Sequence, residues 1–180
     1  MFLKVYPVPA EDARSALREP HLLQRLQHPN LTAIYGADTL HAEDGNHICL
    51  EMELIGGGSF NDVIRAAVQT GCRLPVHETI RLVSGAAAGL AHLHDSGFVH
   101  RDVKPANLMV RVQSANREGA VTDLGLASRL DSHTGRAFSS RHARVYRPPE
   151  VWQGLGYSVR SDLYQLGVVL FQLTLVQNNF

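Results

Sequence analysis

The chain has 180 residues, in which 17 Lys and Arg balance 17 Asp and Glu and 44% of the residues are hydrophobic. This composition is typical of a globular domain and excludes disordered and fibrous chains. The formal net charge of zero removes the electrostatic argument for nucleic acid or an anionic membrane as the main partner. We expect one domain that buries its own core without a disulfide framework or a structural metal.

Cysteine content and the first residues predict the compartment. Cys49 and Cys72 have no metal-binding spacing, so we expect plain thiols in a reducing environment. Prolines and acidic residues interrupt the first twelve positions, which predicts no signal peptide. The longest apolar stretch, residues 163–176, is broken by polar residues and is shorter than the roughly 20 residues of a membrane span. We therefore expect a cytoplasmic protein with no membrane segment.

The first third of the chain predicts short strands around one helix. Residues 3–6, 31–35 and 47–52 are rich in Val, Ile, Leu and Tyr at strand length. Between the first two, residues 12–26 carry apolar side chains at helical spacing, although Pro20 interrupts the pattern. Three consecutive glycines at residues 56–58 then predict a hinge-like connection.

Beyond this connection the pattern becomes mainly helical. Residues 78–95 place apolar side chains on one helical face, and Gly97 follows as a C-terminal stop signal. Residues 163–176 predict a second helix that is buried in the core. His92 and His94 have no carboxylate or Cys partner at ligand spacing, so we interpret them as structural residues of the first helix.

A hairpin and a long loop are predicted between these helices. Residues 108–112 and 120–122 have strand character and flank turn-forming residues 114–119. Residues 128–147 show no periodicity and contain five arginines, which favours a functional loop. No internal repeat or low-complexity tract is present.

The strongest motif is His-Arg-Asp-Val-Lys-Pro-Ala-Asn at residues 100–107. Random residue usage would produce its five specified positions, HRDxKxxN, with odds on the order of 10⁻⁵ to 10⁻⁴ per chain. The segment resembles the catalytic loop of the protein kinase family, and Lys104 resembles the serine/threonine branch. The resemblance implies a bilobal α+β fold, with a remnant of the small β lobe at residues 1–54 and part of the helical lobe at residues 55–180.

The resemblance also assigns roles in phosphoryl transfer, which needs a positioned hydroxyl and neutralised phosphate charge. Asp102 would accept or orient the substrate hydroxyl, Lys104 would balance charge on the transferred group, and Asn107 would offer an oxygen to Mg²⁺. Asp-Leu-Gly at residues 123–125 resembles the metal-binding Asp-Phe-Gly motif of the family. By this resemblance Asp123 is the main Mg²⁺ ligand.

Residues upstream resemble the ATP-binding part of the family. Lys4 resembles the strand lysine that binds the α and β phosphates, and Glu19 falls at the position of its ion-pair partner. Pro20, directly after Glu19, disfavours helical geometry there, so the residues themselves argue against this ion pair. The order of the motifs along the chain supports the assignment of Lys4.

The resemblance further implies an adenine site. Met52 would be the gatekeeper, backbone groups of Glu53 and Ile55 would hydrogen-bond adenine, and Met109 would form an apolar floor. Phe2 stands where the family carries a small alanine, so we expect its ring to crowd the nucleotide.

The loop before residue 150 resembles a kinase activation segment ending in Tyr-Arg-Pro-Pro-Glu. Its five arginines and its hydroxyl residues leave two interpretations open with equal weight: autophosphorylation within residues 128–141 that orders the loop, or a solvated basic surface. Asp162 matches a buried helix aspartate that would hold the backbone near His100. Ala143 stands where serine/threonine kinases usually carry Thr.

Some family parts have no counterpart in the chain. A Gly-rich loop before Lys4 and helices after the one containing Asp162 are missing, so we expect truncation at both ends, an exposed apolar face on the last helix and a Glu150 without its usual arginine. Our leading hypothesis is a fragment of a serine/threonine kinase that transfers the γ-phosphate of Mg-ATP to protein Ser/Thr hydroxyls. The alternatives are a catalytically inert kinase-like binding module and, less favoured, a small-molecule phosphotransferase.

Overall fold

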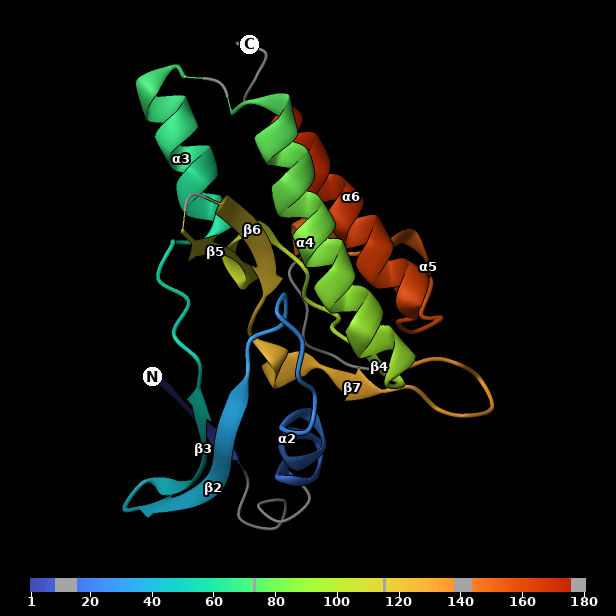
Figure 1. Ribbon diagram of the computed structural model, residues 1–180. Coiled ribbons are helices and arrows are strands. Elements are labelled where there is room, and N and C mark those ends of the chain that lie inside the picture. The colour runs from blue at the N-terminus through green and yellow to red at the C-terminus, as the bar shows by residue number, and fades with distance from the viewer. Residues whose placement is uncertain (9–15, 73, 115, 138–143, 176–180) are drawn as a thin grey trace.

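The computed structural model describes residues 1–8, 16–72, 74–114, 116–137 and 144–175. A three-stranded antiparallel sheet forms one end of the molecule and a group of helices forms the other, and the chain crosses between them after β3 (Figure 1). The sheet has the order β1-β3-β2, with β1 at Phe2–Val8, β2 at Ile34–Ala42 and β3 at Gly45–Met52. The predicted α+β fold is confirmed.

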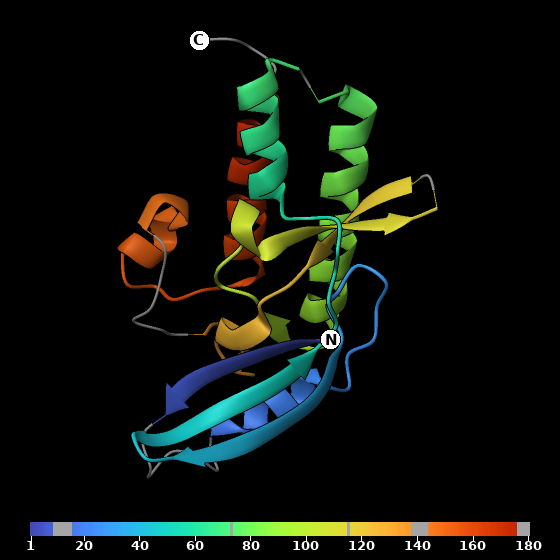
Figure 2. The same ribbon diagram turned by 90° about the vertical axis from the view of Figure 1, so that its left-hand side faces the viewer.

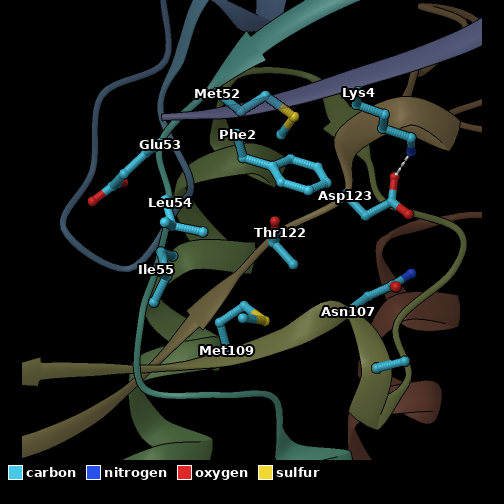
Figure 3. Close-up of a pocket in the computed structure, with 11 residues that line it drawn as sticks. Phe2, Lys4, Met52, Glu53, Leu54, Ile55, Asn107, Met109, Thr122 and Asp123 are labelled. Carbon is cyan, nitrogen blue, oxygen red and sulfur yellow. Dashed lines mark hydrogen bonds and ion pairs between the residues drawn. The ribbon is translucent and has the colours of Figure 1, made fainter.

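Alternation along β1 positions the two side chains that matter for the site. Lys4 is partly buried between the exposed Leu3 and Val5, so it lies on the opposite face from them. In the register of the sheet, Lys4 pairs with Leu50 and Phe2 pairs with Met52. Phe2, Lys4 and Met52 are thereby grouped at the end of the sheet that is nearest to the helices (Figure 3).

Helix α2 (Arg18–Leu23) lies along one face of this sheet (Figure 2). It lies within the helix predicted at residues 12–26 but ends at Leu23, three residues before the predicted end, while residues 9–15 lie outside the described residues. Pro20 is its third residue, in the first turn, where a helix does not use the backbone N–H that proline lacks. Proline therefore did not prevent helical geometry at Glu19.

The predicted position of the second strand was wrong. Residues 31–35 were expected, but β2 begins at Ile34 and continues to Ala42, and Leu31 instead forms an isolated parallel bridge with Val121. Gly36 and Asp38 have low strand propensity, so the sequence pattern does not indicate a strand here. Pairing with β3 makes this segment a strand despite that propensity.

Among the described residues beyond β3, the α-helices are α3 (Phe60–Thr70), α4 (Val76–Asp95), α5 (Pro149–Trp152) and α6 (Val159–Leu175). α4 and α6 confirm the helices predicted at residues 78–95 and 163–176, with residue 176 outside the described residues. α3 was not predicted. It begins with a capping box, in which Ser59 Oγ accepts a hydrogen bond from Asp62 N at 3.2 Å, and it ends at Gly71 with φ +64°.

The predicted hairpin is confirmed as β5 (Leu108–Gln113) and β6 (Asn116–Val121), but its turn is shorter than expected. Gly119 was placed in the turn and in fact lies inside β6. A Cβ built on Gly119 would stand 1.9 Å from the carbonyl oxygen of Leu82 in α4. Glycine is therefore required here for close approach of helix and strand, and not for a turn.

The loop predicted at residues 128–147 begins with a short strand. β7 (Ser128–Arg129) pairs with β4 (Phe98–Val99), the two residues before the catalytic-loop motif. Residues 138–143, which include Ala143 and part of the segment predicted for autophosphorylation, lie outside the described residues.

One buried cluster connects the sheet, the hairpin and the helices. Its members include Leu23, Ile48, Leu50, Met52, Leu82, Leu90, Leu93, Leu108, Val110, Val121, Val169 and Leu173. This common core holds β1 and β3 against the hairpin, and the candidate site lies at that junction. None of the helices in the described ranges combines the length and apolar character needed to cross a bilayer.

Candidate active site

A cavity of about 320 Å³ opens between the sheet and the hairpin (Figure 3). Its lining comes from β1, β3, the connection after β3, the end of the catalytic-loop motif, β5 and the segment with Thr122 and Asp123. The lining residues are Phe2, Lys4, Met52, Glu53, Leu54, Ile55, Ala106, Asn107, Met109, Thr122 and Asp123. Seven of the ten predicted site residues are among them.

The predicted catalytic residues Asp102 and Lys104 do not line the cavity themselves, but hydrogen bonds connect them to it. Asn107 Nδ2 donates to the carbonyl oxygen of Asp102 at 2.8 Å and to its Oδ2 at 2.9 Å. Lys104 Nζ donates to the same Oδ2 at 2.6 Å. Because its Nδ2 is committed to Asp102, Asn107 keeps its Oδ1 for a ligand in the cavity.

The catalytic-loop motif has a strained backbone that α6 holds in place. Arg101 has φ +70°, in the left-handed region that disfavours non-glycine residues. Asp162, completely buried, accepts hydrogen bonds from His100 N and Arg101 N, each at 2.8 Å. It also accepts one from the ring of His94. The predicted role of Asp162 as the support of this loop is confirmed.

His100 joins the catalytic loop to the strand that leads to Asp123. Its Nδ1 accepts a hydrogen bond from Asp102 N at 3.3 Å, which leaves Nε2 to donate to the carbonyl oxygen of Thr122 at 2.8 Å. The loop with Asp102 and the segment with Asp123 therefore have a fixed relative position.

Lys4 and Asp123 form an ion pair across the cavity, although they are 119 positions apart in the sequence. Asp123 is itself strained, with φ +60°. Burial raises the pKa of Asp123, but the hydrogen bond and charge of Lys4 outweigh it, so the pKa lies below its ordinary value. Asp123 is consequently an anion at neutral pH.

Glu19 is a correction to the predicted site. Its carboxylate accepts hydrogen bonds from Ser128 Oγ at 2.9 Å and from Arg129 N at 3.4 Å, and it does not line the cavity. Lys4 is paired with Asp123 instead. The prediction that Lys4 and Glu19 do not pair is therefore confirmed. The reason given for it was wrong, because Glu19 is helical although Pro20 follows it.

The apolar wall of the cavity contains Met52 and Met109, and the ring of Phe2 extends between Met52 and Thr122 (Figure 3). The side chain of Glu53 points away from the cavity to a bidentate ion pair with Arg111 of β5, of which the Nη2 to Oε2 distance is 2.7 Å. Glu53 N donates to the carbonyl oxygen of Ala33 at 2.9 Å. Because its side chain points to Arg111, Glu53 lines the cavity through its backbone.

The model of the protein kinase domain family matches residues 3–180 of this chain. The chain belongs to the protein kinase family. Within this kinase fold, Asn107 and Asp123 line one cavity.

Curated kinases resemble the chain at moderate identity. The serine/threonine-protein kinase PknJ of Mycobacterium tuberculosis is 31% identical over 159 residues, which are 87% of this chain and 26% of the relative. The serine/threonine-protein kinase pkn2 of Myxococcus xanthus is 31% identical over 160 residues, 87% of this chain and 18% of the relative. Nek9 of Xenopus laevis is 31% identical over 175 residues, 94% of this chain and 17% of the relative. The chain therefore spans about a quarter or less of these relatives.

Three contacts among the described residues hold the end of the segment that resembles a kinase activation segment. Glu150, expected without its arginine, accepts a hydrogen bond from Ser161 Oγ at 2.6 Å. The guanidinium of Arg147 lies 4.2 Å from the centre of the Trp152 ring, and Arg136 donates to the carbonyl oxygen of Leu155 at 2.7 Å. These two arginines are engaged with the protein itself.

Sequence reasoning missed several residues of the site. Thr122 lines the cavity directly before Asp123, a position that the Asp-Leu-Gly motif could have indicated. Leu54 and Ala106 likewise lie next to predicted residues. Arg111 and Gln165, which contact Glu53 and the catalytic loop, gave no sequence signal, because only folding brings them there.

Proposed function

We propose that the chain carries the catalytic centre of a serine/threonine protein kinase, which transfers the γ-phosphate of ATP to Ser or Thr hydroxyls of a protein. One observation carries this proposal: Asn107 and Asp123 share a cavity with Lys4, and Asn107 is hydrogen-bonded directly to Asp102. Lys104, two residues after Asp102, and the similarity to serine/threonine-protein kinases such as PknJ favour the serine/threonine branch.

The residues of the chain divide the work of phosphoryl transfer. Asp102, 6% exposed, orients the acceptor hydroxyl and takes its proton, and Lys104 beside it balances charge on the moving group. Lys4 binds phosphate oxygens of ATP as a positive charge. Met52 and Met109 form the apolar walls around the adenine. The backbone carbonyl of Glu53 and the backbone N–H of Ile55 form hydrogen bonds with the edge of the adenine ring.

The donor set of the cavity fits Mg²⁺. Asp123 supplies an ionised carboxylate and Asn107 a neutral amide oxygen, which are hard ligands. Among the described residues no group of three His, Cys, Asp or Glu forms a metal cage. Mg²⁺ is commonly bound by one or two protein oxygens together with substrate phosphates, so a two-residue set suffices. When bound, Mg²⁺ would neutralise charge on the phosphate oxygens.

Substitution of the proposed base tests this function. In the full-length protein, Asp102→Asn should lower label transfer from γ-labelled ATP to dephosphorylated casein by about 10²- to 10⁴-fold, the usual loss for a positioned base. Its fold should be retained, because an amide keeps the size of the side chain. Asp44→Asn, at an exposed position in the β2–β3 turn, is the matched control and should leave transfer unchanged.

The outcome separates the kinase from the inert binding module. If Asp102→Asn transfers label at the rate of the unmodified protein, Asp102 is not the base and the proposal fails. If the unmodified protein transfers none while it binds Mg-ATP, the inert module is favoured.

A further inference from the structure

The buried face of α6 carries two long-range polar contacts to the catalytic loop, one turn apart. Asp162 makes the first of them. Gln165, 1% exposed, makes the second: its Oε1 accepts a hydrogen bond from Val103 N at 3.1 Å, and its Nε2 donates to the carbonyl oxygen of Arg101 at 3.3 Å. The Gln165 amide therefore bonds the residues on both sides of Asp102.

We propose that Gln165 is a positioning residue for the reaction, which fixes the peptide units that carry Asp102; this inference rests on the proposed function. Arg101 N is held by Asp162, and Arg101 O is held by Gln165. The strained φ of +70° at Arg101 persists only if its surroundings fix it from both sides. Gln165 supplies the second side.

The chemistry of the contact specifies glutamine. A backbone N–H needs an acceptor and a backbone carbonyl needs a donor, and the carboxamide of Gln165 offers the two from separate atoms without a charge. Asp162, as a carboxylate, can only accept, so it cannot hold Arg101 O. An apolar side chain of the same length would leave Val103 N and Arg101 O without these partners in the core.

Displacement of the loop would act on the position of Asp102 relative to Lys104 and Asn107, which hydrogen-bond its Oδ2. It would not act directly on the wall formed by Met52, Ile55 and Met109 or on the Lys4–Asp123 pair, which come from other segments. The inference therefore predicts a loss in the rate of transfer without a matching loss in ATP binding. A residue that merely stabilised the fold would not separate these two quantities.

The test compares Gln165→Met with Gln172→Met in the full-length protein. Gln172 lies on the same helix and accepts a hydrogen bond from Tyr146 Oη at 3.1 Å, away from the catalytic loop, so it is the matched control. For Gln165→Met we expect kcat for casein phosphorylation to fall about tenfold or more, because small displacements of a catalytic group are costly, while the KM for ATP stays within about twofold. Gln172→Met should keep both values.

Hydrogen exchange gives a readout that does not depend on activity. Amides of residues 100–104 should exchange faster in Gln165→Met than in the unmodified protein, while those of α4 should not. If Gln165→Met does not fold, Gln165→Glu replaces it in the test. An ionised Glu keeps the length and the acceptor of Gln but has no donor, so we expect the same fall in kcat and the same unchanged KM for ATP.

The inference is overturned by a kcat within twofold of the unmodified protein, by an equal loss of kcat in Gln172→Met, or by unchanged exchange at residues 100–104. A parallel rise in the KM for ATP would assign Gln165 a merely structural role and would also overturn it. If the unmodified protein transfers no phosphate, the proposed function fails separately, and exchange at residues 100–104 alone decides whether Gln165 holds the loop.

Discussion

Phe2 occupies part of the cavity that we propose as the nucleotide site. Its ring lines the cavity although about half of the residue, 51%, remains exposed. The position opposite it in the sheet is Met52, so two large side chains face the space that an adenine would take. The small residue that the kinase family carries there would leave this space open.

Phe2→Ala should therefore bind Mg-ATP about fivefold more tightly, which corresponds to about 1 kcal/mol of binding free energy. The expected cost to folding is small, because the ring is only half buried. Isothermal titration of the full-length protein measures the affinity. Leu3→Ala, on the opposite face of β1 and 55% exposed, is the control and should bind as the unmodified protein does. Weaker binding of Mg-ATP by Phe2→Ala would contradict this prediction and would show that the ring supports the adenine.

At the scale of elements, the Glu53–Arg111 pair fixes the connection after β3 to the hairpin strand β5. The side chains are 22% and 17% exposed, so the pair is largely shielded from water. The hydrogen bond from Arg111 lowers the pKa of Glu53 below its ordinary value of 4.5, against the opposing effect of burial. The adenine wall depends on this connection, because Glu53 and Ile55 belong to it.

Arg111→Met should lower the free energy of unfolding by about 1 to 3 kcal/mol at neutral pH, since it leaves a partly buried carboxylate without its charged partner. A carboxyl whose pKa is lower in the folded state stabilises the fold above its unfolded pKa, and this contribution is lost as the pH falls through the folded value. The difference between Arg111→Met and the unmodified protein should thus shrink as the pH falls below 4.5.

Urea unfolding over a series of pH values measures this difference. The matched control is Arg65→Met: Arg65 pairs with Asp62 at 3.4 Å with both side chains more than half exposed, and such pairs contribute about 0 to 1 kcal/mol. An effect of Arg111→Met no larger than that of Arg65→Met, or one that grows in acid, would contradict the account.

The elements differed in how far the sequence could predict them. α4 and α6 could be predicted, because apolar side chains recur at helical spacing over the length of each segment. α3 was missed although Ser59 and Asp62 form a capping-box pair and Gly71 follows the helix, so its signals were local and readable. β2 could not be placed, because Gly36 and Asp38 become strand residues only through pairing with β3.

At the scale of the whole molecule, the site is assembled from segments that are distant in the sequence. The motifs predicted Asn107 and Asp123 individually, and the fold brings them to one cavity with Lys4. Sequence could not predict that Lys4 pairs with Asp123 and not with Glu19, because that choice depends on where α2 lies against the sheet. The contacts of Gln165 and Arg111 likewise exist only in the folded chain.

Helix α6 exposes one apolar face, so the prediction of a helix buried in the core at residues 163–176 was wrong for that face, whereas the exposed face expected from the missing family helices is confirmed. Its exposed side chains are Leu163, Tyr164, Leu170 and Phe171. On the opposite face, Asp162 and Gln165 are buried against the catalytic loop. The position of the catalytic loop therefore depends on how α6 packs in the core.

The central claim is that one cavity, built from both parts of the molecule, binds ATP together with Mg²⁺. The most direct measurement is calorimetric titration of the full-length protein with ATP, in Mg²⁺ and again in excess EDTA, alongside Asp123→Asn. We predict binding that strengthens with Mg²⁺, and an affinity for Mg-ATP at least about tenfold lower in Asp123→Asn, equivalent to about 1.4 kcal/mol. Binding that is indifferent to both Mg²⁺ and Asp123→Asn, or no binding at all, would contradict the claim.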